Sequence, residues 1–251
     1  MRCGPRRASS RQQPDLEKDL IDNIRSDSRG GADHGRLKSK HTFSFADYHN
    51  PEMMGFAKLR VVNEDWIEPG TGFGTHPHRD MEIVTYMIDG ALEHKDSMGN
   101  GSVIRPGELQ RMTAGTGVLH SEYNHSEEEK AHLLQIWILP ERNGLEPGYE
   151  QKLFPSEEKR NQWRLVGSRD GRDGSLTIHQ DVELSSTELE PGQALDYVFN
   201  GRRRGFLQVV RGSIEIDGET LSAGDAVATQ DHDRLTVKAV EDSELLLFDM
   251  A

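Results

Sequence analysis

Two short motifs, His76-Pro77-His78 and His120-Ser121-Glu122, lie within residues 70–124 of the chain. In each motif the two outer residues are two positions apart, and residues with this spacing on a β-strand point to the same face. Each motif can therefore direct two ligand atoms toward one point. If the two strands face each other, they offer three imidazole nitrogens and one carboxylate oxygen, a ligand set suited to a divalent transition metal.

Short β-rich runs separated by turn residues surround the two motifs. Residues 82–88 precede Asp89-Gly90, residues 102–105 precede Pro106-Gly107, and the strongly apolar run 131–139 ends at Pro140. Closely spaced short strands with glycine and proline turns are typical of an antiparallel barrel or jelly roll. The sequence therefore predicts an all-β fold with few short helices.

The turns of the first half recur in the second half at one constant spacing. Glu68-Pro69-Gly70 corresponds to Glu190-Pro191-Gly192, and Asp89-Gly90 corresponds to Arg211-Gly212. Matched turns of this kind predict two copies of one β-barrel unit. We expect a polar, poorly ordered tail over residues 1–34, a metal-binding barrel over 35–145, a linker over 146–161 and a barrel without metal over 162–251.

The second copy provides an internal control for the candidate ligands. It carries none of them at the corresponding positions, where the residues are Val198, Asn200, Val237 and Ala239. If the barrel needed the histidines for its structure, the second copy would be expected to keep them. Their loss therefore favours a chemical role for the four residues of the first copy.

The composition excludes several classes of protein. The chain has 251 residues, a formal net charge of −13 and one cysteine, Cys3. An acidic protein repels the phosphate backbone, so we expect no direct nucleic-acid binding. The sequence has no apolar run long enough to cross a membrane and no apolar run after its basic start, which argues against a membrane span or a secretory signal. A single cysteine fits a reducing compartment, and we predict a cytoplasmic protein.

The ligand motifs resemble those of a known superfamily. Gly70-x5-His76-x-His78-x3-Glu82 resembles the first cupin motif, and Gly117-x2-His120-x3-Asn124 resembles the end of the second. His76-Pro77-His78-Arg79, residues 112–117 and His120-Ser121-Glu122 are similar to the pirin family, which includes bacterial quercetin 2,3-dioxygenase-like proteins. This resemblance covers about residues 31–251 and implies a bicupin whose second barrel binds no metal.

The resemblance implies a specific metal site. Its ligands would be His76, His78, His120 and Glu122, whereas Glu82 would have a supporting or structural role. Three imidazoles and one carboxylate suit Fe, Mn, Co, Ni, Cu or Zn, and no thiolate is present to favour a structural zinc site. Among these metals, the resemblance implies one Fe(II) ion.

Three hypotheses of function follow. The resemblance implies a dioxygenase that opens a small aromatic enol such as a flavonol with O₂, with Glu122 as the catalytic group that takes the enol proton. The alternative is a non-enzymatic iron and redox sensor that binds and regulates a transcription factor or a metabolic enzyme. The third hypothesis is a structural metal without turnover, which predicts a site sealed by side chains.

Overall fold

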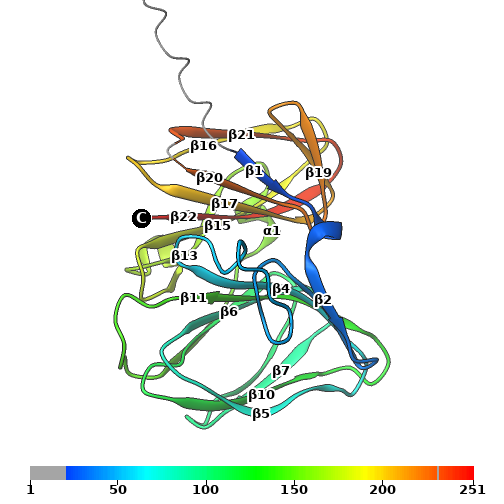
Figure 1. Cartoon of the computed structure of the whole chain (residues 1–251), viewed down its shortest axis with the longest axis vertical. Helices are drawn as coiled ribbons and strands as arrows, with labels where there is room; N and C mark the ends of the chain where they lie inside the picture. Colours follow the sequence, from blue (N-terminus) through cyan, green and yellow to red (C-terminus); the bar gives the residue numbers. More distant parts are fainter. Residues whose placement is uncertain (1–20, 231) are drawn as a thin grey trace, which may run out of the picture.

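The computed structural model describes residues 21–230 and 232–251, and this part of the chain is almost entirely β-structure (Figure 1). It contains 22 strands in four sheets, together with the short helix α1 (Ser156–Lys159) and the 3₁₀ turns η1 (Ser26–Ser28) and η2 (Arg172–Gly174). All strand pairs are antiparallel except β13 with β14. None of the helices in these two ranges is long and apolar enough to cross a membrane.

The first barrel consists of two sheets. The larger sheet contains, in spatial order, β12 (Gly148–Leu153), β9 (Glu108–Thr113), β6 (Glu82–Asp89), β11 (Ala131–Ile138), β4 (Leu59–Ile67), β3 (Leu37–His41) and β2 (Gly30–Asp33). The smaller sheet contains β5 (Gly72–His78), β10 (Val118–Asn124), β7 (Leu92–Asp96) and β8 (Gly101–Ile104).

The second barrel repeats this arrangement. Its larger sheet contains β1 (Ile21–Ile24), β20 (Ala226–Gln230), β17 (Arg204–Arg211), β22 (Ser243–Met250), β15 (Val182–Leu189), β13 (Arg164–Ser168) and β14 (Leu176–Thr177). Its smaller sheet contains β16 (Ala194–Val198), β21 (Arg234–Ala239), β18 (Ser213–Ile216) and β19 (Glu219–Ser222). The two strand orders match, which confirms the predicted pair of antiparallel barrels.

The repeated turns owe their geometry to glycine. Gly90 and Gly212 have φ angles of 76° and 74°, in the left-handed region that side chains with a Cβ rarely adopt. A Cβ on Gly90 would lie 2.6 Å from the Lys130 carbonyl oxygen, and one on Gly212 would lie 2.1 Å from that of Asp242. Each glycine thus allows a close backbone approach that no other residue would fit.

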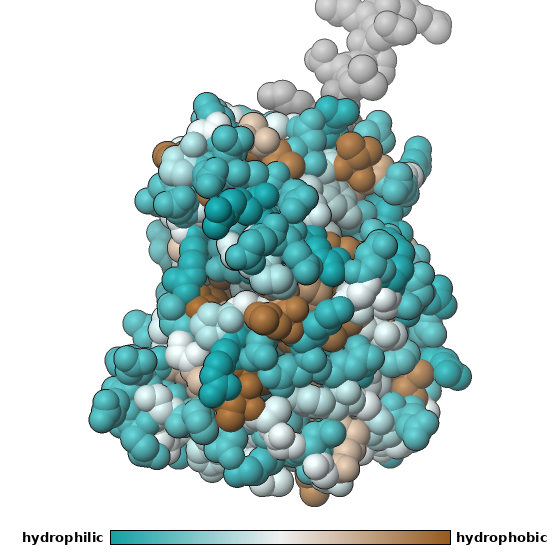
Figure 2. Space-filling model, turned by 180° about the vertical axis from the view of Figure 1, so that it is seen from behind, coloured by the Kyte–Doolittle hydropathy of each residue, from teal (hydrophilic) through white to brown (hydrophobic). Residues whose placement is uncertain are grey.

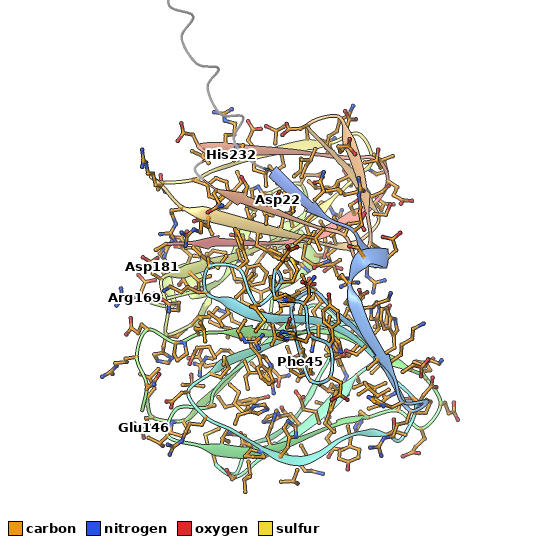
Figure 3. The ribbon with its side chains drawn as sticks, in the orientation of Figure 1. Asp22, Phe45, Glu146, Arg169, Asp181 and His232 are labelled. Carbon is orange, nitrogen blue, oxygen red and sulfur yellow. The ribbon has the colours of Figure 1, made fainter. Side chains whose placement is uncertain are left out.

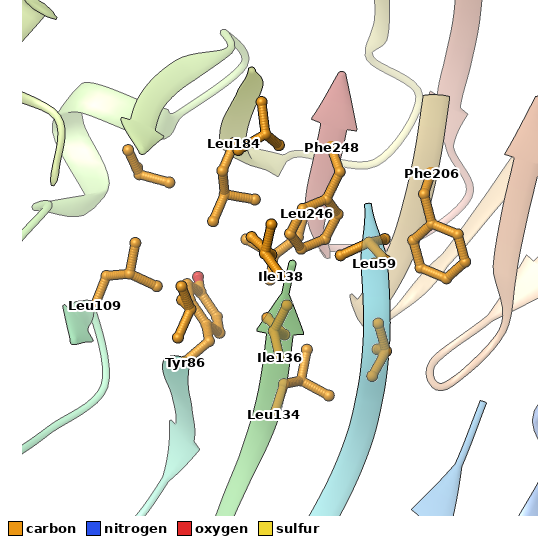
Figure 4. Close-up of a cluster of buried hydrophobic side chains, with 14 of the residues drawn as sticks. Leu59, Tyr86, Leu109, Leu134, Ile136, Ile138, Leu184, Phe206, Leu246 and Phe248 are labelled. Atoms are coloured by element: carbon orange, nitrogen blue, oxygen red, sulfur yellow. The ribbon is translucent and has the colours of Figure 1, made fainter. Parts of the chain in front are cut away.

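The two larger sheets pack against each other in the middle of the molecule (Figure 1). Leu134, Ile136 and Ile138 of β11 point toward the second barrel, where Leu246 and Phe248 of β22 belong to the same buried cluster (Figure 4). Strand β11 is buried on both faces, which explains why it reads as a continuous apolar run. The smaller sheets lie at the two outer ends, and the metal motifs are on the outer sheet of the first barrel.

The N-terminal segment differs from the prediction of a poorly ordered tail over residues 1–34. Strand β1 pairs with β20 of the second barrel and β2 pairs with β3 of the first, so residues 21–33 join both sheets. The side chain of Arg29 is fully buried in an ion pair with Glu64. Nothing in the sequence near Arg29 identifies this partner, because Glu64 lies 35 positions away. Residues 1–20 lie outside the described ranges.

The predicted linker also contains part of the first barrel. Strand β12 lies within residues 146–161 and pairs with β9 along its whole length. It is the edge strand of its sheet, where proline and glycine nearby are tolerated. Pro147 and Gly148 therefore mark the start of an edge strand of the first barrel, whereas the sequence predicted a linker between the barrels.

The surface is polar over most of its area, in keeping with the acidic composition. The face seen in Figure 2 is mainly hydrophilic, with small hydrophobic areas near the junction of the two barrels. The exposed large hydrophobic residues are few in the described ranges, and include Leu119 and Tyr123 on the outer face of β10.

Candidate metal centre

The structure brings the three motif histidines together. Strands β5 and β10 are neighbours in one sheet, and His76 lies directly opposite His120 in their register. The ring centroids are 4.4 Å apart for His76 and His120, and 4.8 Å apart for His78 with either of the other two. One ring nitrogen from each of the three lies within 4.8 Å of the others. The motifs lie side by side in one sheet, whereas the sequence prediction set them on strands facing each other.

A bulge adjusts the position of this group. His120 pairs with His76, but Glu122 pairs with Phe73, so β5 has one extra residue between these pairs. Within the bulge, His76 Nδ1 donates a hydrogen bond to the Gly74 carbonyl oxygen at 2.7 Å. Because this bond fixes the proton on Nδ1, Nε2 of His76 is left free to bind a metal.

The buried histidines have the charge state that a metal requires. Burial, then the nearby His76 and His78, lower the pKa of His120 to about 3. Burial, followed by the effect of His76, lowers the pKa of His78 to about 4. Neither ring nitrogen of His120 has a hydrogen-bond partner among the described residues. Because buried polar atoms are rarely unpaired, neutral imidazoles with a free nitrogen fit a metal well.

Glu122 lies beside His120 and is held by an amide. Gln135 Nε2 donates to both carboxylate oxygens of Glu122, at 2.9 and 2.8 Å. Burial raises the pKa of Glu122 to about 7, while the hydrogen bond from Gln135 opposes this shift. The ligand atom of Glu122 lies within 4.8 Å of His120 and of His94, in a second group that excludes His76 and His78.

His94 belongs to the second group of candidate metal ligands, although the sequence did not single it out as a ligand. It lies opposite Glu122 in the register of β7 and β10, and its Nε2 is 3.2 Å from Asp96 Oδ2. Its ring packs between Tyr149 and His120, with centroid distances of 5.0 and 5.4 Å. Burial lowers the pKa of His94. The i, i+2 spacing of His94 and Asp96 was the signal that could have identified it.

Glu82 serves a different purpose from the histidines. It is fully buried on β6, and its Oε2 accepts hydrogen bonds from the backbone and Nδ1 of His179, at 3.2 and 3.3 Å. His179 precedes β15 of the second barrel. Glu82 belongs to neither group of candidate metal ligands among the described residues and connects the two barrels instead.

A row of buried polar residues faces the candidate site from the larger sheet. Five adjacent strands each contribute one residue in register: His41, Asn63, Gln135, Thr85 and Gln110. Gln135 and Thr85 contact Glu122, while His41 Nδ1 lies 2.9 Å from Asn63 Oδ1. In β11 the sequence signal is Gln135, a polar residue between Leu134 and Ile136, whereas β3, β4 and β9 contain several polar residues each and give no such signal.

A cavity of about 460 Å³ opens onto this centre. His76, His78, His120 and Glu122 line one part of it, and residues of β2, β3 and β4 line another. Phe45 (labelled in Figure 3), Phe73 and Trp137 also border it, and the rings of Phe45 and Trp137 meet edge to face at 5.4 Å. The cavity gives a small molecule access to the histidines, which contradicts the expectation of a sealed structural site.

Comparisons with known proteins find relatives that cover both barrels. Residues 23–138 match the family model described as pirin, and residues 165–250 match the quercetinase C-terminal cupin domain. The chain is 50% identical over 226 residues to a quercetin 2,3-dioxygenase of Escherichia coli strain K12, covering 90% of this chain and 96% of that protein. It is 41% identical over 233 residues to a pirin-like protein of Caulobacter vibrioides, covering 92% and 100%.

The chain belongs to the pirin family. Solved structures of this family show the same fold. The crystal structure of YhhW from Escherichia coli has a TM-score of 0.89 and 49% identity, covering 92% of this chain and 98% of that one. The bacterial pirin YhhW in complex with nickel(II) has a TM-score of 0.88 and 48% identity, covering 92% and 99%. The cupin fold and the histidine cluster together identify a metal-binding site.

The second pirin barrel has hydrophobic residues where the first has the candidate ligands. Ile214 of β18 corresponds to Leu92 of β7 and pairs with Ala239, just as Leu92 pairs with Asn124. The constant offset that relates the turns of the two copies does not hold for the candidate ligands. The bulge in β5 shifts the offset there, and the connection before β21 is shorter than the one before β10. The strand pairings give the equivalents of His76, His78, His120 and Glu122 in the second barrel, which are Tyr197, Phe199, Leu235 and Val237, respectively. The sequence prediction of Val198, Asn200, Val237 and Ala239 was therefore wrong by one or two positions.

Proposed function

We propose that this protein is a metal-dependent dioxygenase that opens a flavonol-type aromatic enol with O₂. The observation that carries the proposal is the group of three histidine side chains at the wall of a cavity of about 460 Å³, beside the buried carboxyl of Glu122. The relative named quercetin 2,3-dioxygenase supports the substrate class.

In this proposal His76, His78, His120 and Glu122 hold one divalent transition metal. Iron(II) is the ion we propose, and the existence of a nickel(II) complex of a relative supports binding of a first-row metal ion. When bound, the metal would supply a Lewis acid that lowers the pKa of the enol and a centre for O₂ chemistry. Burial keeps the pKa values of His78 and His120 low, so these two imidazoles need no proton loss to bind it.

The protein residues around the centre position the substrate and its proton. Phe45 and Trp137 border the cavity and can pack against a flat aromatic molecule. Glu122 faces the same space, and we assign its carboxylate the role of accepting the enol proton. Gln135 holds that carboxylate in place through both oxygens. Burial of His120 and Glu122 keeps bulk water from these groups.

The test is an anaerobic incubation of purified, iron-loaded protein with quercetin, followed by admission of O₂. We expect the visible absorption band of quercetin to disappear only after O₂ enters, and to persist in the His76→Ala variant. No O₂-dependent loss, or the same loss in the variant, would contradict the proposal. Metal binding without turnover would instead favour the regulatory hypothesis, in which the iron state controls a protein partner.

A further inference from the structure

The cavity has a second polar wall, whose residues make no hydrogen bond to the candidate metal ligands in the described part of the chain. Ser39 and His41 of β3 and Asn63 and Asp65 of β4 all line it. Ser39 Oγ donates a hydrogen bond to Asp65 Oδ1, and His41 Nδ1 lies 2.9 Å from Asn63 Oδ1 and 3.3 Å from Ser39 Oγ. The four residues form a connected network on the strands next to β11, which carries Gln135.

Asp65 is the unusual member of this wall. It is only 3% exposed, and none of its contacts within the described residues is an ion pair with a cation. The neighbouring Glu64 points to the opposite face of β4, where it takes both Arg29 and His132 as partners. A buried carboxyl normally has a cation or several donors, because its desolvation is costly. Asp65 has one donor, Ser39, in this part of the chain.

The chemistry of Asp65 suits recognition of a hydroxyl group. A carboxyl group has about four acceptor positions, and Ser39 occupies one of them. Burial raises the pKa of Asp65 to about 7, and the hydrogen bond from Ser39 opposes the shift. Near neutral pH the group can therefore accept a hydrogen bond or donate one to a ligand in the cavity. His41, whose pKa is lowered by burial, is neutral beside it.

We propose that Asp65, held by Ser39, binds a hydroxyl group of the substrate that is separate from the enol at the metal ligands. This inference rests on the proposed dioxygenase function and narrows its substrate class. The substrate would be a polyhydroxylated aromatic enol, anchored at the histidines by one oxygen function and at Asp65 by another. A purely structural Asp65, which only ties β3 to β4, would not distinguish ligands by their hydroxyl groups.

A ligand without the hydroxyl group is expected to bind more weakly, because it leaves the buried Asp65 carboxyl without that hydrogen-bond partner. A site built to hydrogen-bond a hydroxyl group rejects an analogue that lacks it, because the polar protein group then has no partner. A hydrogen bond to a charged or strongly polar group corresponds to a change in affinity of about tenfold or more. Quercetin and 3-hydroxyflavone are a suitable pair of probes, because both carry the enol and only quercetin carries further hydroxyl groups.

The test is an anaerobic titration of iron(II)-loaded protein with each flavonol, followed by the change in its visible absorption. The parent protein is expected to bind quercetin about tenfold more tightly than 3-hydroxyflavone. In Asp65→Leu this preference should disappear because only quercetin binding weakens, and Asp65→Asn should retain part of it. Equal losses for both flavonols, no loss for either, or no preference in the parent would overturn the inference.

Controls separate this outcome from other failures. Iron content and thermal unfolding of each variant establish that the site and the fold are intact, and Asp65→Asn serves if Asp65→Leu does not fold. Ser39→Ala, which frees Asp65 to rotate, should reduce the preference for quercetin less than Asp65→Leu. If the parent binds neither flavonol, the proposed function itself fails. If it binds both equally, the function stands and the role of Asp65 is wrong.

Discussion

The two barrels share one strand order and differ in what fills them. The first barrel encloses four histidines of the candidate ligand groups, the two buried carboxyl groups that line the cavity and a row of polar side chains. The interior of the second is a continuous hydrophobic cluster that includes Phe199, Leu235 and Val237. The polar interior is therefore not a requirement of the fold. It is a feature of one copy, kept at the expense of hydrophobic packing.

The polar row, in which Gln135 and Thr85 contact Glu122, shows the difference strand by strand. In the first barrel the residues in register are Asn63, Gln135, Thr85 and Gln110. The matching residues of the second barrel are Ser185, Leu247, Leu207 and Val227. A buried Leu or Val side chain contributes about 1.5–3 kcal/mol of stability. The first barrel gives up this contribution at three strands, as expected for a functional site.

The largest expected effect comes from replacing His120 with leucine, the residue that the second barrel has at the equivalent position, Leu235. We predict that His120→Leu reduces bound metal to background, because it removes the ligand shared by both candidate groups. The metal-free protein should become more stable, since two unpaired buried nitrogens are replaced by an apolar side chain. Metal analysis of purified protein and thermal unfolding check these outcomes. Retention of metal by the variant would contradict the claim that His120 is the ligand that distinguishes the first barrel from the second.

The reverse exchange tests whether the second barrel tolerates a polar interior. Leu247→Gln places an amide opposite Ser185 and Leu207, with no carboxylate to receive it. The free energy of unfolding should fall by about 3 kcal/mol, because apolar burial is lost and a polar group is left unpaired. Denaturant unfolding measures this value. Metal content should stay at the parent level, and a gain of metal would contradict the assignment of the second barrel.

A smaller effect is expected from the support of Glu122. Gln135→Leu introduces the residue found at the matching position of the second barrel and leaves the Glu122 carboxylate without its amide donor. We predict a loss of metal affinity of about 10- to 100-fold, as is usual for residues that orient a ligand. A competition titration with a chelator measures it.

The matched control for this change is Gln208→Leu in the second barrel. Gln208 is also a buried glutamine, and its amide donates to the backbone oxygens of Val209 and Asp225. This variant should lose stability and keep the metal affinity of the parent. Equal losses of metal affinity in both variants would mean that the effect of Gln135 is a general consequence of weakened folding.

The smallest expected effect concerns pH. Burial raises the pKa of Asp65 to about 7, so the folded protein keeps a proton that the unfolded chain releases at lower pH. Stability must then fall as pH rises from about 4 to 7. Between pH 5 and pH 8, the melting temperature of metal-free Asp65→Asn should therefore fall by about 4 °C less than that of the metal-free parent. Asp196→Asn, an exposed site of the second barrel, should retain the pH dependence of the parent.

The sequence predicted the features that depend on local spacing. The i, i+2 pairs of His76 and His78 required only that the segment be a strand, and Gly90 and Gly212 required only a tight turn. These features are independent of what lies across the sheet. The paired barrels and the meeting of the three histidines followed from them.

The sequence did not predict features that depend on distant partners. Strand β1 joins the sheet of the second barrel, and nothing in residues 21–24 identifies β20 as its neighbour. The β5 bulge shifts the alignment of the two copies by one residue, which local patterns do not reveal. The burial of Asp65 depends on β11 and β3, the strands on either side of β4, and nothing in the sequence around Asp65 identifies them.

The most direct test of the account is a crystal structure of the iron-loaded protein with anomalous difference maps at the iron edge. We predict one peak per chain, bonded to His76, His78, His120 and Glu122, with Gln135 still hydrogen-bonded to Glu122. No peak should occur in the second barrel near Tyr197 and Leu235. A peak at another position, or a peak to which His120 does not bind, would contradict the assignment of the first barrel as the metal centre.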